Sequence, residues 1–189
     1  MRSLRRPTVA LGRAVAISAL GISLVACAPR RQVDVGWAPT PTAIAAQGLE
    51  WLGVHKGDVV AELGCGDGRV AVVAAQLGAD VLCVELDPLL AAKARAAVAQ
   101  AGVADHVRVI EGDIFQTDFS RANVVFFFLL PSVNDRLLPL FRRQLKPGTR
   151  LLSREFQFRE WPAEQTLSLP GFTFYAWTLP PRAVAADHP

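Results

Sequence analysis

The amino-acid sequence predicts an α/β fold with a doubly wound, mostly parallel seven-stranded sheet and an antiparallel hairpin at its C-terminal edge. Three observations support this fold class. Short apolar runs alternate with segments of helical periodicity, a pattern typical of parallel strands that helices cover on both faces. A glycine-rich turn follows the first apolar run. The last two strand-like segments have no room for a helix between them, which indicates an antiparallel pair.

The predicted strands are short, and most are continuous runs of apolar residues, as expected where both faces of a sheet are buried. The run 123–130 is the clearest, because every residue after Asn123 is apolar. In chain order, the predicted strands are 58–63, 80–85, 107–110, 123–130, 149–153, 165–169 and 172–177.

Apolar residues at helical spacing predict helices between the parallel strands. Pro88 favours a helix start, because proline suits the first turn, where its missing N–H costs nothing. The turn Lys-Pro-Gly at 146–148 ends the last helix and leads into the next strand. The predicted helices are 43–52, 70–77, 88–101 and 133–145.

The chain has 189 residues, of which 51% are hydrophobic and 20% charged, enough for one ordinary domain with a packed core. Residues 28–42 are rich in proline and polar residues and are interpreted as a linker. We therefore expect an N-terminal segment 1–27, the linker, a domain over 43–180 and a tail over 181–189.

The N-terminal segment resembles a signal for export. Arg2, Arg5 and Arg6 precede an apolar run, 14–26, of about the length of a signal-peptide core and short for a membrane span. The run ends in Leu-Val-Ala before Cys27, like the lipobox of bacterial lipoproteins, which predicts lipidation at Cys27 and an exported, membrane-anchored protein. The alternatives are an uncleaved anchor and a domain on the cytoplasmic face of the membrane.

The charge balance argues against a nucleic-acid partner. The formal net charge is +3, but four arginines and no acidic residue precede Cys27. From Cys27 onward, 16 Lys and Arg stand against 17 Asp and Glu, a net charge of −1, whereas a surface that binds nucleic-acid phosphates needs a basic face.

Cys65 and Cys83 are expected to be buried thiols, without support for a disulfide framework. The three histidines are scattered along the sequence, so no metal site is predicted.

The strongest motif is Glu-Leu-Gly-Cys-Gly-Asp-Gly-Arg at 62–69. Glycines between a strand and a helix let the backbone approach a ligand closely. The motif is not the dinucleotide fingerprint, because Arg69 stands where the third glycine belongs. The Glu62 carboxylate would repel a pyrophosphate, but it suits the cationic methionine part of S-adenosylmethionine. A tight turn with no ligand is the other interpretation.

Two further carboxylates follow the next two predicted strands. Glu85 ends the strand 80–85, where a carboxylate can accept hydrogen bonds from both hydroxyls of a ribose. Asp113 follows the strand 107–110 and can accept from an adenine amine. Carboxylates at three successive strand ends predict an S-adenosylmethionine site. The predicted cofactor-binding residues are Glu62, Gly64, Cys65, Gly66, Asp67, Gly68, Glu85, Leu86, Asp113 and Ile114.

These motifs, with others, give the chain a resemblance to the small seven-strand protein-lysine methyltransferases, which include the mitochondrial enzymes acting on ATP synthase c-subunit and on the adenine nucleotide translocase. The family implies a Rossmann-like fold, S-adenosylmethionine as cofactor and methyl transfer to a protein lysine. The segments that carry the resemblance are 38–41, 62–69, 85–88, 112–115, 128–131 with Asn134, 145–150 and 153–161.

The resemblance places the acceptor site at Phe128, Pro131, Glu155 and Trp37, with Glu155 orienting the amine. Trp37, Phe128 and Trp161 are the candidate aromatic walls. The sequence departs from the family here: Phe128 replaces a usual tyrosine, and Arg-Glu-Phe at 154–156 replaces a version with histidine. Two other interpretations therefore remain, a methyltransferase of small molecules and a lipoprotein that binds S-adenosylmethionine without catalysis.

Overall fold

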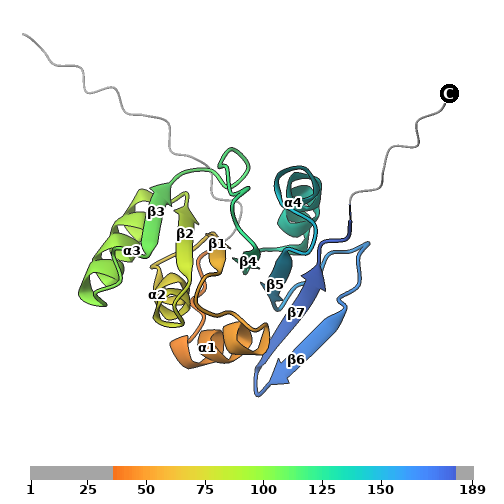
Figure 1. Cartoon of the computed structure of the whole chain (residues 1–189), viewed down its shortest axis with the longest axis horizontal. Coiled ribbons are helices and arrows are strands. Elements are labelled where there is room, and N and C mark those ends of the chain that lie inside the picture. The colour runs from red at the N-terminus through yellow and green to blue at the C-terminus, as the bar shows by residue number, and fades with distance from the viewer. Residues whose placement is uncertain (1–35, 182–189) are drawn as a thin grey trace, which may run out of the picture. The chain divides into compact units, whose positions relative to one another are not determined.

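A computed structural model describes residues 36–181, which form one seven-stranded sheet with the strand order β3-β2-β1-β4-β5-β7-β6 (Figure 1). β1 to β5 run parallel to one another, and β7 is antiparallel to both of its neighbours. The strands are β1 (Val59–Leu63), β2 (Asp80–Glu85), β3 (Val107–Glu111), β4 (Val124–Phe127), β5 (Arg150–Arg154), β6 (Gln165–Leu169) and β7 (Phe172–Thr178).

Helices cover both faces of this sheet. α1 (Thr42–Trp51), α2 (Arg69–Gln76) and α3 (Pro88–Gln100) lie on one face, and α4 (Pro131–Gln144) lies on the other (Figure 1). Loop residues before β4 and after β5, Phe119 and Phe158, complete the cover on the α4 face. The doubly wound sheet, its parallel half and its antiparallel edge hairpin are therefore confirmed.

The core consists of two apolar clusters, one on each face of the sheet. Because successive side chains of a strand point to opposite faces, β4 contributes to both clusters. Val124 and Phe126 pack under α1, α2 and α3, whereas Val125 and Phe127 pack under α4. This explains why the sequence of a buried parallel strand is continuously apolar, whereas a strand with one exposed face alternates apolar and polar residues.

Two element boundaries differ from the predictions at the place where the site lies. β4 ends at Phe127, three residues earlier than predicted, because 128–130 leave the ladder. α4 begins at Pro131, two residues earlier than predicted, with the proline at its first position. The apolar run therefore divides into a buried strand and a loop that carries side chains above the sheet edge.

The predicted lipidation site Cys27, the N-terminal segment 1–27, the first part of the linker and the tail beyond residue 181 lie outside the described residues. Within 36–181, no helix is both long and apolar enough to cross a membrane. The same residues contain no group of three or more His, Cys, Asp or Glu side chains that could hold a metal ion.

Candidate active site

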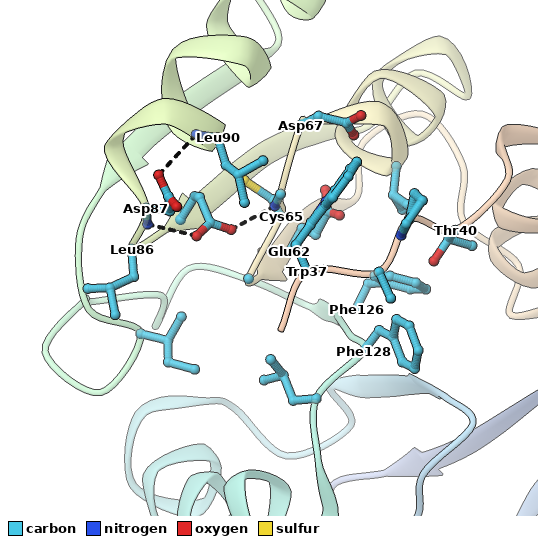
Figure 2. A pocket seen from close by; sticks show the side chains of 18 of the residues that line it. Trp37, Thr40, Glu62, Cys65, Asp67, Leu86, Asp87, Leu90, Phe126 and Phe128 are labelled. Carbon is cyan, nitrogen blue, oxygen red and sulfur yellow. Dashed lines mark hydrogen bonds between the residues drawn. The ribbon is translucent and has the colours of Figure 1, made fainter. Parts of the chain in front are cut away.

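A pocket of about 330 Å³ opens at the carboxyl ends of the parallel strands. Its walls come from the segments that follow β1, β2, β3 and β4, and from the segment 36–40, which crosses the same edge of the sheet. Figure 2 shows Trp37, Glu62 and Phe128 around this cavity. Ligands of open α/β sheets bind at this edge, where the chain leaves each strand.

The turn between β1 and α2 requires glycine for two different reasons. Gly66 has φ 58°, and a β-carbon there would collide with the indole of Trp37. Gly68 has φ 79° and caps α2, and a β-carbon there would lie 2.9 Å from the Cα atom of Ala94 in α3. The first glycine therefore keeps space inside the pocket, and the second allows α2 and α3 to pack closely.

Glu85 lies at the end of β2 and is only 7% exposed. Its Oε2 accepts a hydrogen bond from Gly66 N–H at 2.8 Å, and its Oε1 accepts one from Asp87 N–H at 2.8 Å. Each carboxylate oxygen can accept a second hydrogen bond. Glu85 therefore fixes the glycine turn and still presents acceptors to the pocket that it lines.

Glu62 is 4% exposed, and its Oε2 has no hydrogen-bond partner among the described residues. Burial raises its pKa well above the usual value, and the charges of Asp67 and Glu85 raise it further. A hydrogen bond from Ala71 N–H lowers the pKa but does not offset these effects. A buried acceptor that faces the pocket without a partner is the feature expected of a group that completes its bonding with a cationic ligand.

The other predicted cofactor residues surround the same cavity. Leu86, Asp113 and Ile114 line it, and Asp113 closes its loop by accepting hydrogen bonds from Phe115 N–H at 2.8 Å and Gln116 Nε2 at 3.3 Å. Asp67 also lines it and pairs with Arg69 at 2.6 Å, a hydrogen bond that holds the pKa of Asp67 below its usual value. Gly64 and Cys65 line it as well, whereas Gly68 does not.

The expectation of two unpaired thiols is wrong for the folded domain. Cys65 and Cys83 form a disulfide with 5.4 Å between their Cα atoms. Register explains the pairing: Cys83 lies opposite Glu62 on the neighbouring parallel strand, and the chain turns back toward β2 just after β1. The disulfide therefore fastens the glycine turn to β2 beside the pocket.

The predicted acceptor residues separate into two groups. Trp37 and Phe128 line the pocket, but Pro131 and Glu155 are not among its lining residues. Pro131 opens α4, and the Glu155 carboxylate lies 3.4 Å from Arg154 Nε. Trp161, the third predicted wall, packs against Phe158 and Trp177 in the core under α4. The geometry brings two of the four residues together and does not favour the role predicted for Glu155.

Several polar residues at the site were not predicted. Thr40, Arg69 and Arg136 line the pocket, and Arg136 stacks on the Phe115 ring at 4.1 Å. Arg69 could have been found, because it is the last residue of the glycine motif. Arg136 has a weaker signal, the helical spacing after Pro131. Thr40 lies in the segment 38–41 that carries the family resemblance, but its role depends on a partner far along the chain, Arg154.

The ANTKMT methyltransferase domain is the family whose profile matches this chain, over residues 62–165. The chain belongs to this family. It is 36% identical over 137 residues to a protein-lysine N-methyltransferase of Saccharolobus islandicus, a match that covers 71% of the chain and 85% of that protein. It is 29% identical to the ATP synthase c-subunit lysine N-methyltransferase of Xenopus laevis, covering 79% of the chain and 66% of that protein.

Among solved structures, the chain is similar to an RNA methyltransferase from Salinibacter ruber in complex with S-adenosyl-L-homocysteine. The TM-score is 0.75 and the sequence identity 42%, over 79% of this chain and 98% of that one. This member of the ANTKMT methyltransferase-domain family is therefore an S-adenosylmethionine-dependent methyltransferase. The residues present fit the cofactor: Glu62 offers its cationic part an acceptor that has no partner within 36–181, and Glu85 and Asp113 stand at the next two strand ends.

Proposed function

We propose that this methyltransferase acts on a lysine side chain of a protein. The observation that carries the proposal is the similarity to the Saccharolobus islandicus protein-lysine N-methyltransferase, which extends over 85% of that protein. The pocket supports it, because the end beside β4 is lined by Phe126, Phe128, Leu129 and Val133. Apolar walls favour the neutral amine over the ammonium ion, and only the neutral amine has a lone pair that can attack.

The order of the strands assigns the parts of the cofactor and the acceptor to successive positions along the pocket. Asp113, Glu85 and Glu62 follow β3, β2 and β1, so the adenine, ribose and methionine parts of the cofactor are assigned along the sheet in that order. The next strand is β4, which brings Phe128 to the methionine end. The acceptor therefore enters between the glycine turn and the end of β4.

Bound S-adenosylmethionine supplies an activated methyl group, so the chain needs no nucleophile of its own. The task of the protein is alignment and the exclusion of water. Glu62, Glu85 and Asp113 would hold the cofactor, while Trp37 covers the glycine turn and Phe128 bounds the acceptor end. No histidine of residues 36–181 lines the pocket, and an amine that arrives neutral requires no base within it.

RNA is the second candidate acceptor, because the similar Salinibacter ruber chain carries the name RNA methyltransferase. The charge of this chain favours a protein acceptor. The net charge from Cys27 onward is −1, whereas proteins that bind RNA concentrate Lys and Arg on the contact face.

To test the acceptor, the protein is incubated with membrane and RNA fractions and S-adenosylmethionine labelled on its methyl group. We expect label on lysine side chains of membrane-fraction proteins, identified by mass spectrometry, and none with the Glu85→Ala variant. Label confined to RNA, to metabolites, or to arginine or carboxylate side chains would exclude the lysine proposal.

We further propose that the protein is an exported lipoprotein that is anchored to a membrane through Cys27. The supporting features are the basic start, the apolar run 14–26 and the small residues before Cys27. The Cys65–Cys83 disulfide fits an oxidising compartment outside the cytoplasm. In a bacterial host, a palmitate analogue should label the protein but not its Cys27→Ala variant. An unlabelled protein that keeps Met1 would point to an uncleaved anchor or a cytoplasmic domain.

A further inference from the structure

Arg154, the last residue of β5, is a charged side chain that is only 8% exposed. Its guanidinium carbon lies 4.2 Å from the centre of the Phe128 ring and 4.9 Å from the centre of the Phe172 ring. Burying an arginine is costly unless its charge and its N–H groups find partners. A buried arginine that spans two aromatic rings therefore needs an explanation beyond core packing.

The hydrogen bonds of Arg154 lead to the segment that crosses the pocket. Its Nη1 donates to Thr40 Oγ1 at 3.0 Å and to the carbonyl of Pro39 at 3.2 Å. Pro39, Thr40 and Phe128 all line the pocket, although Arg154 itself does not. Arg154 therefore connects two walls of the pocket, the segment 36–40 and the end of β4, without lining the pocket itself.

The turn after Arg154 is held in an unfavourable backbone conformation. Glu155 has φ 63°, and among the described residues it is the only one other than glycine with a positive φ. Phe156 N–H donates to the Arg154 carbonyl at 2.8 Å across this turn. Such a conformation is sterically unfavourable for a residue other than glycine and persists only where the surroundings impose it.

The surroundings that impose this turn again lead to Phe128. The Phe156 carbonyl accepts hydrogen bonds from Ser153 Oγ at 2.6 Å and Asn134 Nδ2 at 3.3 Å. The Phe156 ring stacks on Phe128, with 6.0 Å between ring centres and 13° between ring planes. The strained turn thus brings both of its flanking side chains, Arg154 and Phe156, against the same pocket wall.

We propose that Arg154 is a positioning residue for the methyl acceptor. By holding Thr40 and Phe128 in fixed places, it sets the width of the channel through which the acceptor amine reaches the cofactor. This inference rests on the proposed acceptor site beside β4. A lysine could not replace Arg154 fully, because an ammonium group lacks the planar surface that stacks on Phe128 while donating to the segment 36–40.

The test uses two probes with the full-length protein: S-adenosylhomocysteine, and an analogue that carries a butylamine chain at the position of the transferable methyl group. The ratio of their affinities, measured by calorimetry, reports on the acceptor channel without turnover. In the wild type, we expect the amine-bearing probe to bind more tightly. Arg154→Met should reduce this gain at least fivefold and change the affinity for S-adenosylhomocysteine less than threefold.

Four further variants make the test more specific. Arg154→Lys should show an intermediate gain, and Arg108→Met, at an exposed arginine of β3, should leave the gain unchanged. Thr40→Val removes one partner of Arg154 without burying or exposing a charge, and it should lower the gain in the same direction. The double variant Arg154→Met/Thr40→Val should lose less than the two single losses combined, because both act through one contact.

The outcomes separate the two proposals. A wild-type protein that binds S-adenosylhomocysteine but gains nothing from the amine would overturn the amine acceptor, and with it the channel. A wild-type gain that survives both Arg154→Met and Thr40→Val would overturn the role of Arg154 alone. Equal loss of affinity for both probes in these variants would assign Arg154 to the general stability of the fold and also contradict the inference.

Discussion

The buried carboxyl group of Glu62 is expected to favour ligand binding at a cost to the stability of the ligand-free protein. Its pKa is raised in the folded state, so the stability of the ligand-free protein is greatest below the unfolded pKa of about 4.3 and falls as the pH rises through the folded pKa. Glu62→Gln should therefore keep or raise the thermal midpoint of the ligand-free protein. The same variant should bind S-adenosylmethionine more weakly by about 1–3 kcal/mol, because a charged acceptor is lost.

Thermal unfolding and calorimetric titration, run in parallel, check this prediction, with Glu111→Gln at the exposed end of β3 as the control. A variant whose stability and affinity fall together would indicate that Glu62 is structural rather than a cofactor group.

Glu85 stabilises the glycine turn through hydrogen bonds and is also predicted to bind the ribose of the cofactor. Glu85→Ala removes the acceptors for Gly66 N–H and Asp87 N–H as well as those offered to the ligand. We expect the affinity for S-adenosylmethionine to fall by about 1–3 kcal/mol, or about five- to 150-fold. Calorimetric titration measures the loss, and the exposed Glu50→Ala in α1 should show none. Undiminished affinity in a folded Glu85→Ala protein would refute the ribose assignment.

At the scale of elements, the positive φ of Glu155 in the turn after β5 allows a prediction about backbone strain. Glycine adopts the conformation of residue 155 without steric cost, whereas alanine does not. Because both changes remove the Arg154–Glu155 ion pair, their difference isolates the backbone. Glu155→Gly should be more stable than Glu155→Ala by about 1 kcal/mol in urea unfolding.

The control for this prediction is the same pair of changes at the exposed Glu160, which lacks a positive φ. There the order should reverse, because glycine gains more freedom than alanine on unfolding. The same order at both positions would show that Glu155 carries no strain.

The strands and the three carboxylates that line the pocket, Glu62, Glu85 and Asp113, could be predicted because their signals are local. An apolar run, a glycine turn and an acidic strand end lie within a few residues of one another, as at 59–69. The acceptor side could not be predicted in this way. Arg154 and Thr40 are 114 positions apart in sequence, and only the folded sheet brings them together. The Cys65–Cys83 bond likewise depends on the register between β1 and β2.

For the whole molecule, a partly buried ion pair at the amino edge of the sheet joins distant parts of the chain. Asp58 is 2% exposed, and Arg150 donates to it at 2.7 Å and to the carbonyls of Leu52 and Gly53 after α1. Burial raises the pKa of Asp58, but hydrogen bonds from His55 N–H, Arg150 and Asn123 more than offset this, and the pKa is lowered overall.

A lowered folded pKa means that Asp58 stabilises the fold above the unfolded pKa of about 3.9 and loses this effect as the pH falls through the folded value. Asp58→Asn should therefore cost about 1–3 kcal/mol at neutral pH and make stability less sensitive to acid. Denaturant unfolding at several pH values measures both effects. Asp80→Asn, which alters an exposed pair with His106, should cost less than about 1 kcal/mol. A cost at neutral pH that persists undiminished in acid would contradict the assignment.

The disulfide gives a second prediction for the whole molecule. It closes a loop of sequence separation 18, for which the loss of chain entropy in the unfolded state corresponds to about 3 kcal/mol. Unfolding should therefore begin at a lower denaturant concentration with a reducing agent present, and Cys65→Ala/Cys83→Ala should show no such response. If reduction left the wild-type midpoint unchanged, the bond would not form in solution.

The strand order also has a consequence for how this enzyme can diversify. The groups assigned to the cofactor follow β1, β2 and β3, whereas the proposed acceptor wall lies at the end of β4 and packs against Arg154 of β5, which also contacts Phe172 of the edge strand β7. Apart from the segment 36–40, these assignments place recognition of the methyl donor and choice of the acceptor in successive halves of the chain. Substitutions in the second half can redirect the enzyme to new acceptors while the donor half is inherited unchanged.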